Sequence, residues 1–90
     1  MTPRDPAAPD VKARSATPLQ GQYLAFIHTY TKLHRLAPAE SDMQRYFQVT
    51  PPSVHQMVLT LERRGFIGRE PGRARSIRVL LPSERLPELD

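Results

Sequence analysis

Apolar residues recur with helical spacing near the middle of the chain. Val54, Val58 and Leu61 stand at positions i, i+4 and i+7, which places them on one face of a helix. The pattern predicts a helix over residues 51–64, roughly 21 Å long. A helix of this length can lie in a DNA major groove with its first turns near the bases.

The same stretch carries its own start and stop signals. Thr50 can cap the helix with its hydroxyl, and Pro51 suits the first helical position because an amide is not needed there. Gly65 suits the position just after a helix, where the backbone often adopts the left-handed conformation. Arg63 and Arg64 fall in the last turn, where cations suit helix carbonyl oxygens or a phosphate, and the sequence leaves both alternatives open.

An earlier helix is predicted from the pair Thr17-Pro18 to about Arg35. It repeats the order of capping residue and proline, and Gly21 is its weak position, costing about 1 kcal/mol relative to alanine. A broad apolar face is formed by Tyr23, Leu24, Phe26, Ile27 and Tyr30.

A short second helix is predicted from about Ala39 to Phe47, with Met43 and Phe47 four residues apart toward the core. Only residues 48–50 separate it from the helix at 51–64. A short helix, a three-residue turn and a longer helix form the helix-turn-helix arrangement. Gln48 stands where that turn usually has a glycine.

After Gly65 the apolar period changes from helical to alternating. Residues 66–70 and 76–81 are predicted strands, with Ile77, Val79 and Leu81 on one face, around a turn that begins at Pro71-Gly72. Three helices followed by this hairpin predict a mainly α fold with a small β-hairpin, the winged helix-turn-helix.

The 90 residues are expected to form one domain with two tails. Residues 1–17 lack periodicity and predict a disordered tail; residues 18–82 form the domain. Residues 83–90 form an acidic tail that either stays free or docks Leu86 and Leu89 on a neighbour.

From Thr17 to Leu81 the chain resembles the N-terminal DNA-binding domain of LexA-type repressors. The resemblance rests on T-P near the start of the first helix, L-A-F-I within it, P-P-S-V-H in the third helix, L-E-R-R-G-F-I at its end, and P-G-R-A-R-S-I-R in the wing. Ala39 and Glu40 depart from it, because the family usually has a capping Ser or Thr and an apolar residue there. The resemblance implies a winged helix-turn-helix that binds double-stranded DNA.

Base contacts are implied for the outward side of the third helix. The residues there are Pro52, Ser53, His55 and Gln56. Gln can bond an adenine edge, His can donate to guanine, Ser can bond several bases, and a proline ring can touch a thymine methyl. A partnerless surface histidine is the alternative for His55. Two prolines at the helix start remove amides that such helices offer to phosphates, so side chains should anchor this end instead.

Positive charge is concentrated from the end of the third helix onward. The net charge is +4, and residues 63–78 hold six arginines and one acid. Such a cluster is typical of a domain that binds a polyanion, although a merely soluble surface is the alternative. Contacts to phosphate or the minor groove are expected from Thr50, Arg45, Arg69, Arg73, Arg75 and Arg78.

Enzymatic chemistry finds no support in the residue inventory. There is no cysteine, Gly-rich phosphate loop or paired catalytic carboxylates, so no enzyme, metal or cofactor is expected. His28 and His34 lie six apart, which is not a helical metal-ligand spacing. LexA repressors also carry a self-cleaving serine-lysine peptidase domain; with Lys12 and Lys32 as its only lysines, the chain is not expected to hold one.

The sequence therefore predicts a sequence-specific DNA-binding transcriptional regulator, a repressor by the resemblance. A homodimer formed through the first helix, the tails or DNA is an open alternative, because one winged helix reads one half-site. No apolar run suggests a signal peptide or membrane span, and a prokaryotic cytoplasmic, nucleoid-associated location is expected. No small-molecule ligand is indicated. The alternative function is a winged-helix protein-interaction module within a larger nucleoprotein assembly.

Overall fold

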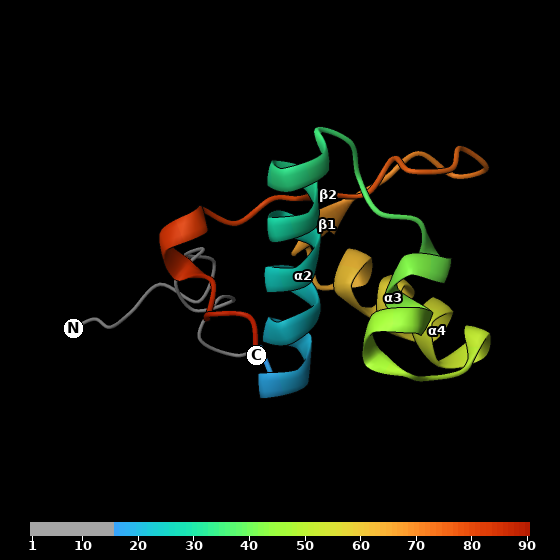
Figure 1. Cartoon of the computed structure of the whole chain (residues 1–90), viewed down its shortest axis with the longest axis horizontal. Coiled ribbons are helices and arrows are strands. Elements are labelled where there is room, and N and C mark those ends of the chain that lie inside the picture. The colour runs from blue at the N-terminus through green and yellow to red at the C-terminus, as the bar shows by residue number, and fades with distance from the viewer. Residues whose placement is uncertain (1–15) are drawn as a thin grey trace.

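The computed structural model describes residues 16–90 of the chain. In this range, helices come first, followed by a two-stranded antiparallel sheet and a short 3-10 helix (Figure 1). The elements are α2 (Pro18–His34), α3 (Glu40–Phe47), α4 (Pro51–Arg63), β1 (Ile67–Gly68), β2 (Arg78–Val79) and η1 (Ser83–Arg85). This order confirms the predicted winged helix-turn-helix. The predicted disordered tail lies, up to residue 15, outside the described residues.

Helix α2 begins at a capping box formed by Thr17 and Gln20. The Thr17 hydroxyl accepts from the Gln20 amide at 3.1 Å, and the Gln20 side chain accepts from the Thr17 amide at 3.0 Å. Pro18 occupies the first helical position. The helix ends at His34, after which Arg35 is left-handed with φ 62°. The predicted extent of this helix is confirmed.

Helix α3 begins at Glu40, one residue later than predicted. The residue before it, Ala39, has no side chain that could cap the helix. Asp42 supplies the missing bond, because its Oδ2 accepts from the Ala39 amide at 2.8 Å. The departure from the expected Ser or Thr is therefore compensated within the first turn.

The turn between α3 and α4 adopts its geometry without a glycine. Gln48 is left-handed, with φ 57° and ψ 53°, and donates its amide to the carbonyl of Gln44. The left-handed conformation costs a non-glycine residue roughly 1–2 kcal/mol. Packing of the two helices offsets this cost.

Helix α4 has the predicted signals at both ends. The Thr50 hydroxyl accepts from the Ser53 amide at 3.3 Å, and Pro51 is the first helical residue. Beyond its last turn, Gly65 is left-handed with φ 79°, as predicted.

The wing strands are shorter than predicted. Ile67 pairs with Val79 and Gly68 with Arg78, and only these residues count as strand. The predicted strands over 66–70 and 76–81 were too long. The Ser76 hydroxyl bonds the backbone of Glu70 in place of a partner strand, at 2.9 Å from the Glu70 amide and 3.2 Å from its carbonyl oxygen. The alternation itself is confirmed: Ile77 is buried and Val79 and Leu81 are half-buried.

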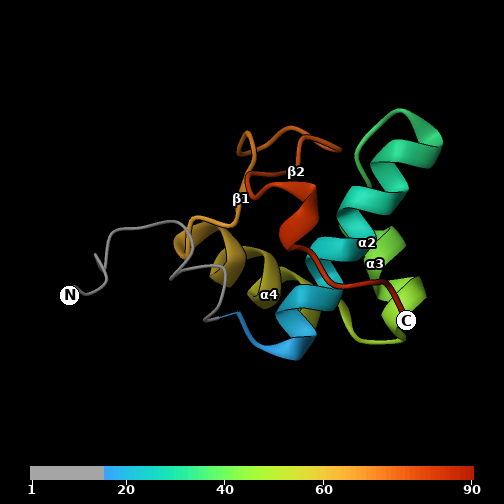
Figure 2. The ribbon, with the colours of Figure 1, turned by 90° about the vertical axis from the view of Figure 1, so that its left-hand side faces the viewer.

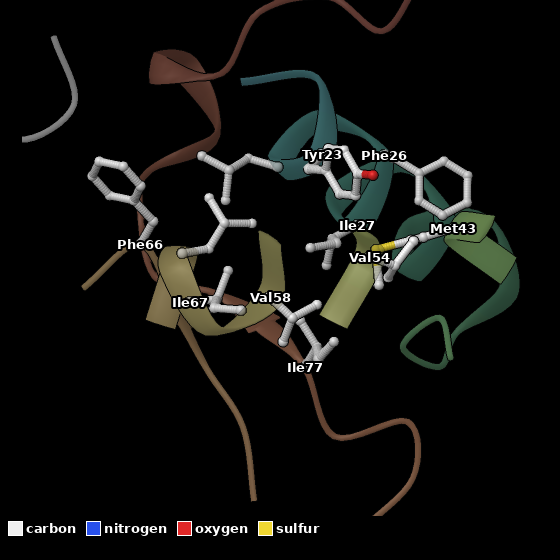
Figure 3. Packing of buried hydrophobic residues seen from close by; sticks show 11 residues of the cluster. Tyr23, Phe26, Ile27, Met43, Val54, Val58, Phe66, Ile67 and Ile77 are labelled. Carbon is white, nitrogen blue, oxygen red and sulfur yellow. The ribbon is translucent and has the colours of Figure 1, made fainter. Parts of the chain in front are cut away.

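The core lies where α2, α3, α4 and the wing meet (Figure 3). Val54, Val58 and Leu61 have no exposed surface, which confirms the predicted inner face of α4. Burying each such side chain stabilises the fold by about 1.5–3 kcal/mol. The remaining cluster members are Tyr23, Leu24, Phe26, Ile27, Met43, Phe66, Ile67 and Ile77.

The C-terminal segment, residues 83–90, runs across α2 (Figure 2). Gln22 donates to the carbonyl of Glu88 and accepts from the amide of Asp90, both at 2.9 Å. Leu86 and Leu89 pack against the core. The sequence left two alternatives, a free segment and a docked one. The segment is docked, and the surface that it contacts belongs to its own domain.

Gly21 lets the C-terminal segment pack closely against α2. A Cβ atom at Gly21 would lie only 3.0 Å from Cγ of Pro87. The glycine in the interior of α2 therefore allows close approach of the C-terminal segment, which offsets its lower helix propensity.

Candidate nucleic-acid interface

The first two turns of α4 separate an apolar inner side from a polar outer side. Val54 is fully buried, whereas the four predicted base-contacting residues are exposed: Pro52, Ser53, His55 and Gln56. Within residues 16–90 the side-chain amide of Gln56 has no hydrogen-bond partner. Its oxygen and nitrogen are both available for a bidentate contact such as that of Gln with adenine.

The start of α4 presents no free backbone amide from its first four residues. Pro51 and Pro52 have none, the Ser53 amide donates to the Thr50 hydroxyl, and the Val54 amide donates to the Thr50 carbonyl at 3.2 Å. Helices usually offer such amides to phosphates. Here the Ser53 hydroxyl lies 2.9 Å from that of Thr50, so side-chain hydroxyls form the polar surface at this end.

The imidazole of His55 contacts the start of α3. Its Nδ1 lies 3.3 Å from both carboxylate oxygens of Glu40. The His55 side chain is 51% exposed and that of Glu40 is 32% exposed. His55 is therefore not a partnerless surface histidine, and its ring is held by a residue from the neighbouring helix.

The turn of the wing carries one arginine in an exposed ion pair. The turn closes through a bond from the Arg73 amide to the Glu70 carbonyl, and Gly72 is left-handed with φ 78°. Nη1 of Arg73 lies 3.1 Å from Glu70, and both side chains are more than half exposed. Exposed pairs of this kind contribute at most about 1 kcal/mol, so Arg73 can exchange its partner for a phosphate.

The second arginine of the turn, Arg75, points back toward the helices. Its Nη1 lies 3.1 Å from Asp42, 3.2 Å from the Ala37 carbonyl and 3.3 Å from the Tyr30 hydroxyl. Its backbone is left-handed, with φ 57°. Arg75 thus fastens the wing to α2 and α3, and its expected DNA contact stays a prediction that would require exchange of these bonds.

Asp42 is the acceptor shared by these contacts. Its side chain is 10% exposed and bonds Arg75, Arg45 and the Ala39 amide. Burial raises the pKa of the Asp42 carboxyl, but the Ala39 hydrogen bond and the charges of Arg75 and Arg45 outweigh it. The pKa therefore lies below its ordinary value.

This lowered pKa predicts acid sensitivity. The unfolded pKa of Asp42 is near 3.8, so its stabilising contribution is complete above that pH and is lost as the pH falls through the lower folded value. We expect the free energy of unfolding from urea titrations to fall between pH 4 and pH 2. The Asp42→Asn variant should lose less stability over this window, and equal losses would contradict the assignment.

Three further predicted cations take different positions. Arg69 is 19% exposed and pairs with Glu62 at 3.1 Å, joining the wing to the end of α4. The guanidinium of Arg78 lies beside Gly68, where a Cβ atom would be 3.0 Å from it. Arg45 bonds Asp42 at 2.9 Å yet remains 75% exposed. Arg45 and Arg78 are thus the more accessible of the three, and a DNA contact by any of them stays a prediction.

The two arginines at the end of α4 contact their own helix and the wing. Arg63 donates to the Thr60 hydroxyl at 3.4 Å, and the Arg64 guanidinium lies 5.1 Å from the centre of the Phe66 ring. A phosphate contact by either residue stays a prediction.

Sequence reasoning missed the acidic partners of this surface. Glu40 and Asp42 are not among the residues that the sequence pattern assigns to this surface. An acid three residues after Ala39 is half of a capping box, a signal that could have revealed the Asp42 bond. The pairs of Asp42 with Arg75 and of Glu62 with Arg69 form through tertiary packing and leave no local signal.

Residues 16–90 contain no group of His, Asp or Glu side chains that could hold a metal ion. His34 instead lies against the ring of Tyr30, with 4.2 Å between centroids. In the same range no helix is long and apolar enough to cross a membrane.

A capped helix with a polar outer face, a short helix before it and an arginine-bearing hairpin after it define a winged helix-turn-helix domain. Residues 13–76 match the model of the family described as LexA DNA binding domain, and the chain belongs to that family of DNA-binding domains.

Relatives include three proteins named LexA repressor. The one from Thermosipho melanesiensis is 32% identical over 73 residues, covering 81% of this chain and 37% of the relative. The one from Thermosipho africanus is 34% identical, covering 74% and 34%. The one from Bartonella quintana is 39% identical, covering 77% and 28%. The chain thus spans about a third of the length of these curated relatives.

Proposed function

We propose that this chain is a sequence-specific double-stranded DNA-binding transcriptional regulator that represses by occupying a promoter. The family match supports DNA binding, and the names of the relatives support repression. The single observation that carries sequence specificity is the outer face of α4. There Gln56 is exposed and unpartnered within the described residues, while Val54 beside it is fixed in the core.

In this proposal α4 enters the major groove with its first turns toward the bases. Gln56 bonds an adenine edge, Pro52 touches a thymine methyl and His55 contacts a base. The exposed Arg73 and Arg78 contact the phosphate backbone or the adjacent minor groove. The proposal requires no cofactor or small-molecule ligand.

Side chains rather than amides hold the start of α4 against phosphate. The amides of Ser53 and Val54 already have partners, and Pro51 and Pro52 have none. The Thr50 and Ser53 hydroxyls and nearby arginines such as Arg45 take their place. A complex in which the Ser53 amide is the main phosphate donor, without a neighbouring side-chain contact, would contradict this.

One domain of this size reads one half-site, so we propose that two copies bind a symmetric site. Selection of preferred duplexes from random DNA tests both points. An enriched inverted repeat supports a dimer on DNA, and a single unrepeated motif supports a monomer.

Salt dependence separates DNA binding from protein binding. If four to six cations meet phosphates, affinity should fall about a hundredfold or more between 50 and 200 mM salt. Fluorescence anisotropy with the selected duplex and with a scrambled duplex measures this slope. A flat slope, or no binding at 50 mM salt, would contradict the proposal and favour a protein-interaction module.

A further inference from the structure

The contact between His55 and Glu40 joins the outer face of α4 to the first residue of α3. It is a bifurcated contact, with Nδ1 of His55 3.3 Å from both Oε1 and Oε2 of Glu40. Both side chains retain exposed surface. The pair therefore lies at the surface that the proposed function turns toward the bases.

When the His55 ring is neutral, its contact with Glu40 decides what the other ring nitrogen can do. An ionised carboxylate only accepts hydrogen bonds, so Nδ1 of His55 must carry the hydrogen. A neutral imidazole carries one N–H, which leaves Nε2 as an acceptor. An acceptor cannot bond a phosphate oxygen, and it cannot bond N7 or O6 of guanine, which are acceptors too.

We propose that Glu40 is a positioning residue that sets the base preference of His55. By accepting from Nδ1–H, it presents Nε2 to an amino group in the major groove, either N6 of adenine or N4 of cytosine. The inference rests on the proposed function, in which α4 reads the major groove. It replaces the contact to guanine that the sequence suggested for His55.

The electrostatics of the surface support this role. A carboxylate close to DNA repels phosphates and lowers the affinity for every sequence. Glu40 nevertheless lies beside the outer face of α4, with its oxygens on His55. The charge of Glu40 therefore opposes affinity, but it fixes which ring nitrogen of His55 donates and which accepts. This combination favours discrimination between sequences.

The tautomer can be measured without DNA. Long-range proton–nitrogen NMR spectra of the full chain at pH 8 should show the neutral ring of His55 with its hydrogen on Nδ1. In Glu40→Ala this preference should be lost. The charge-matched control Glu84→Ala, at an exposed position in η1, should behave as wild type.

The base preference is measured by site selection from random duplex DNA at the same pH. Wild type should enrich adenine or cytosine at one position. Glu40→Ala should reduce the preference there about three- to tenfold, leaving the other positions unchanged, and Glu84→Ala should reduce none. In a His55→Ala background, adding Glu40→Ala should leave the base preference unchanged, while affinity for all duplexes rises because a charge that repels phosphates is removed.

The outcomes distinguish the inference from the proposed function. A hydrogen on Nε2 in wild type, or an unchanged preference in Glu40→Ala, overturns the inference while sequence-specific binding stands. Enrichment of guanine at the position that His55→Ala relaxes overturns it as well. Wild-type protein that selects no preferred site overturns the inference and the proposed function together.

Discussion

Replacing Asp42 with alanine should lower the free energy of unfolding by about 3 kcal/mol. The change removes the bond that caps α3, worth up to about 2 kcal/mol, and leaves the charged groups around a largely buried site without their acceptor. Since a domain of this size has only modest stability, this is a large fraction of the total. Urea titrations of wild type and variant measure the difference.

Two variants make this result specific to the contacts of Asp42. Asp42→Asn keeps an acceptor for the Ala39 amide but loses the charge that bonds Arg75, so its loss should be intermediate. Glu84→Ala removes an exposed acid and should change the free energy by less than about 0.5 kcal/mol. If Asp42→Ala matched Glu84→Ala, Asp42 would not be the residue that fastens the wing.

Replacing His55 and Gln56 together with alanine should lower affinity for the selected site about a hundredfold. Each base contact discriminates by roughly 1–3 kcal/mol, and both are lost. Affinity for scrambled DNA should change little, because neither residue is expected to bind phosphate. Both side chains are exposed and alanine favours helix, so the fold should be retained. Anisotropy titrations with the two duplexes measure the ratio.

The matched control is Arg73→Ala, an exposed arginine on the wing. It should weaken binding to the selected and the scrambled duplex by the same factor and reduce the salt slope by about one. If the double variant at His55 and Gln56 instead weakened both duplexes equally, the outer face of α4 would contact the backbone rather than the bases.

The helices could be predicted because their signals are local. A capping residue followed by proline marks the starts of α2 and α4, and Gly65 marks where the latter has ended. The period of Val54, Val58 and Leu61 also predicts which side of α4 is exposed. The placement of the expected base-contacting residues on that side therefore follows from the sequence alone.

The wing and its arginines could be predicted only in part. Alternation correctly predicted that Ile77 faces inward. Strand length, however, depends on which groups form hydrogen bonds with the backbone, and the Ser76 hydroxyl bonds both the amide and the carbonyl of Glu70. Arg75 and Asp42 are 33 positions apart, so nothing near either residue marks their pairing. The distribution of arginines therefore predicts where positive charge is concentrated. It does not show which guanidinium groups are held in ion pairs within the fold.

The clasp of Gln22 on Glu88 and Asp90 also has a practical consequence. In Figure 1 the C-terminus lies at the foot of α2, while the wing turn and the start of α4 lie toward the opposite end of the long axis. A fluorophore or a partner domain fused after Asp90 would start from an anchor ordered by α2 and α3, because the Tyr46 hydroxyl also donates to the Asp90 carbonyl. The direction in which the chain leaves this attachment point is therefore fixed by the fold and not by the linker. Distances between probes attached there on two bound copies can be interpreted for this reason.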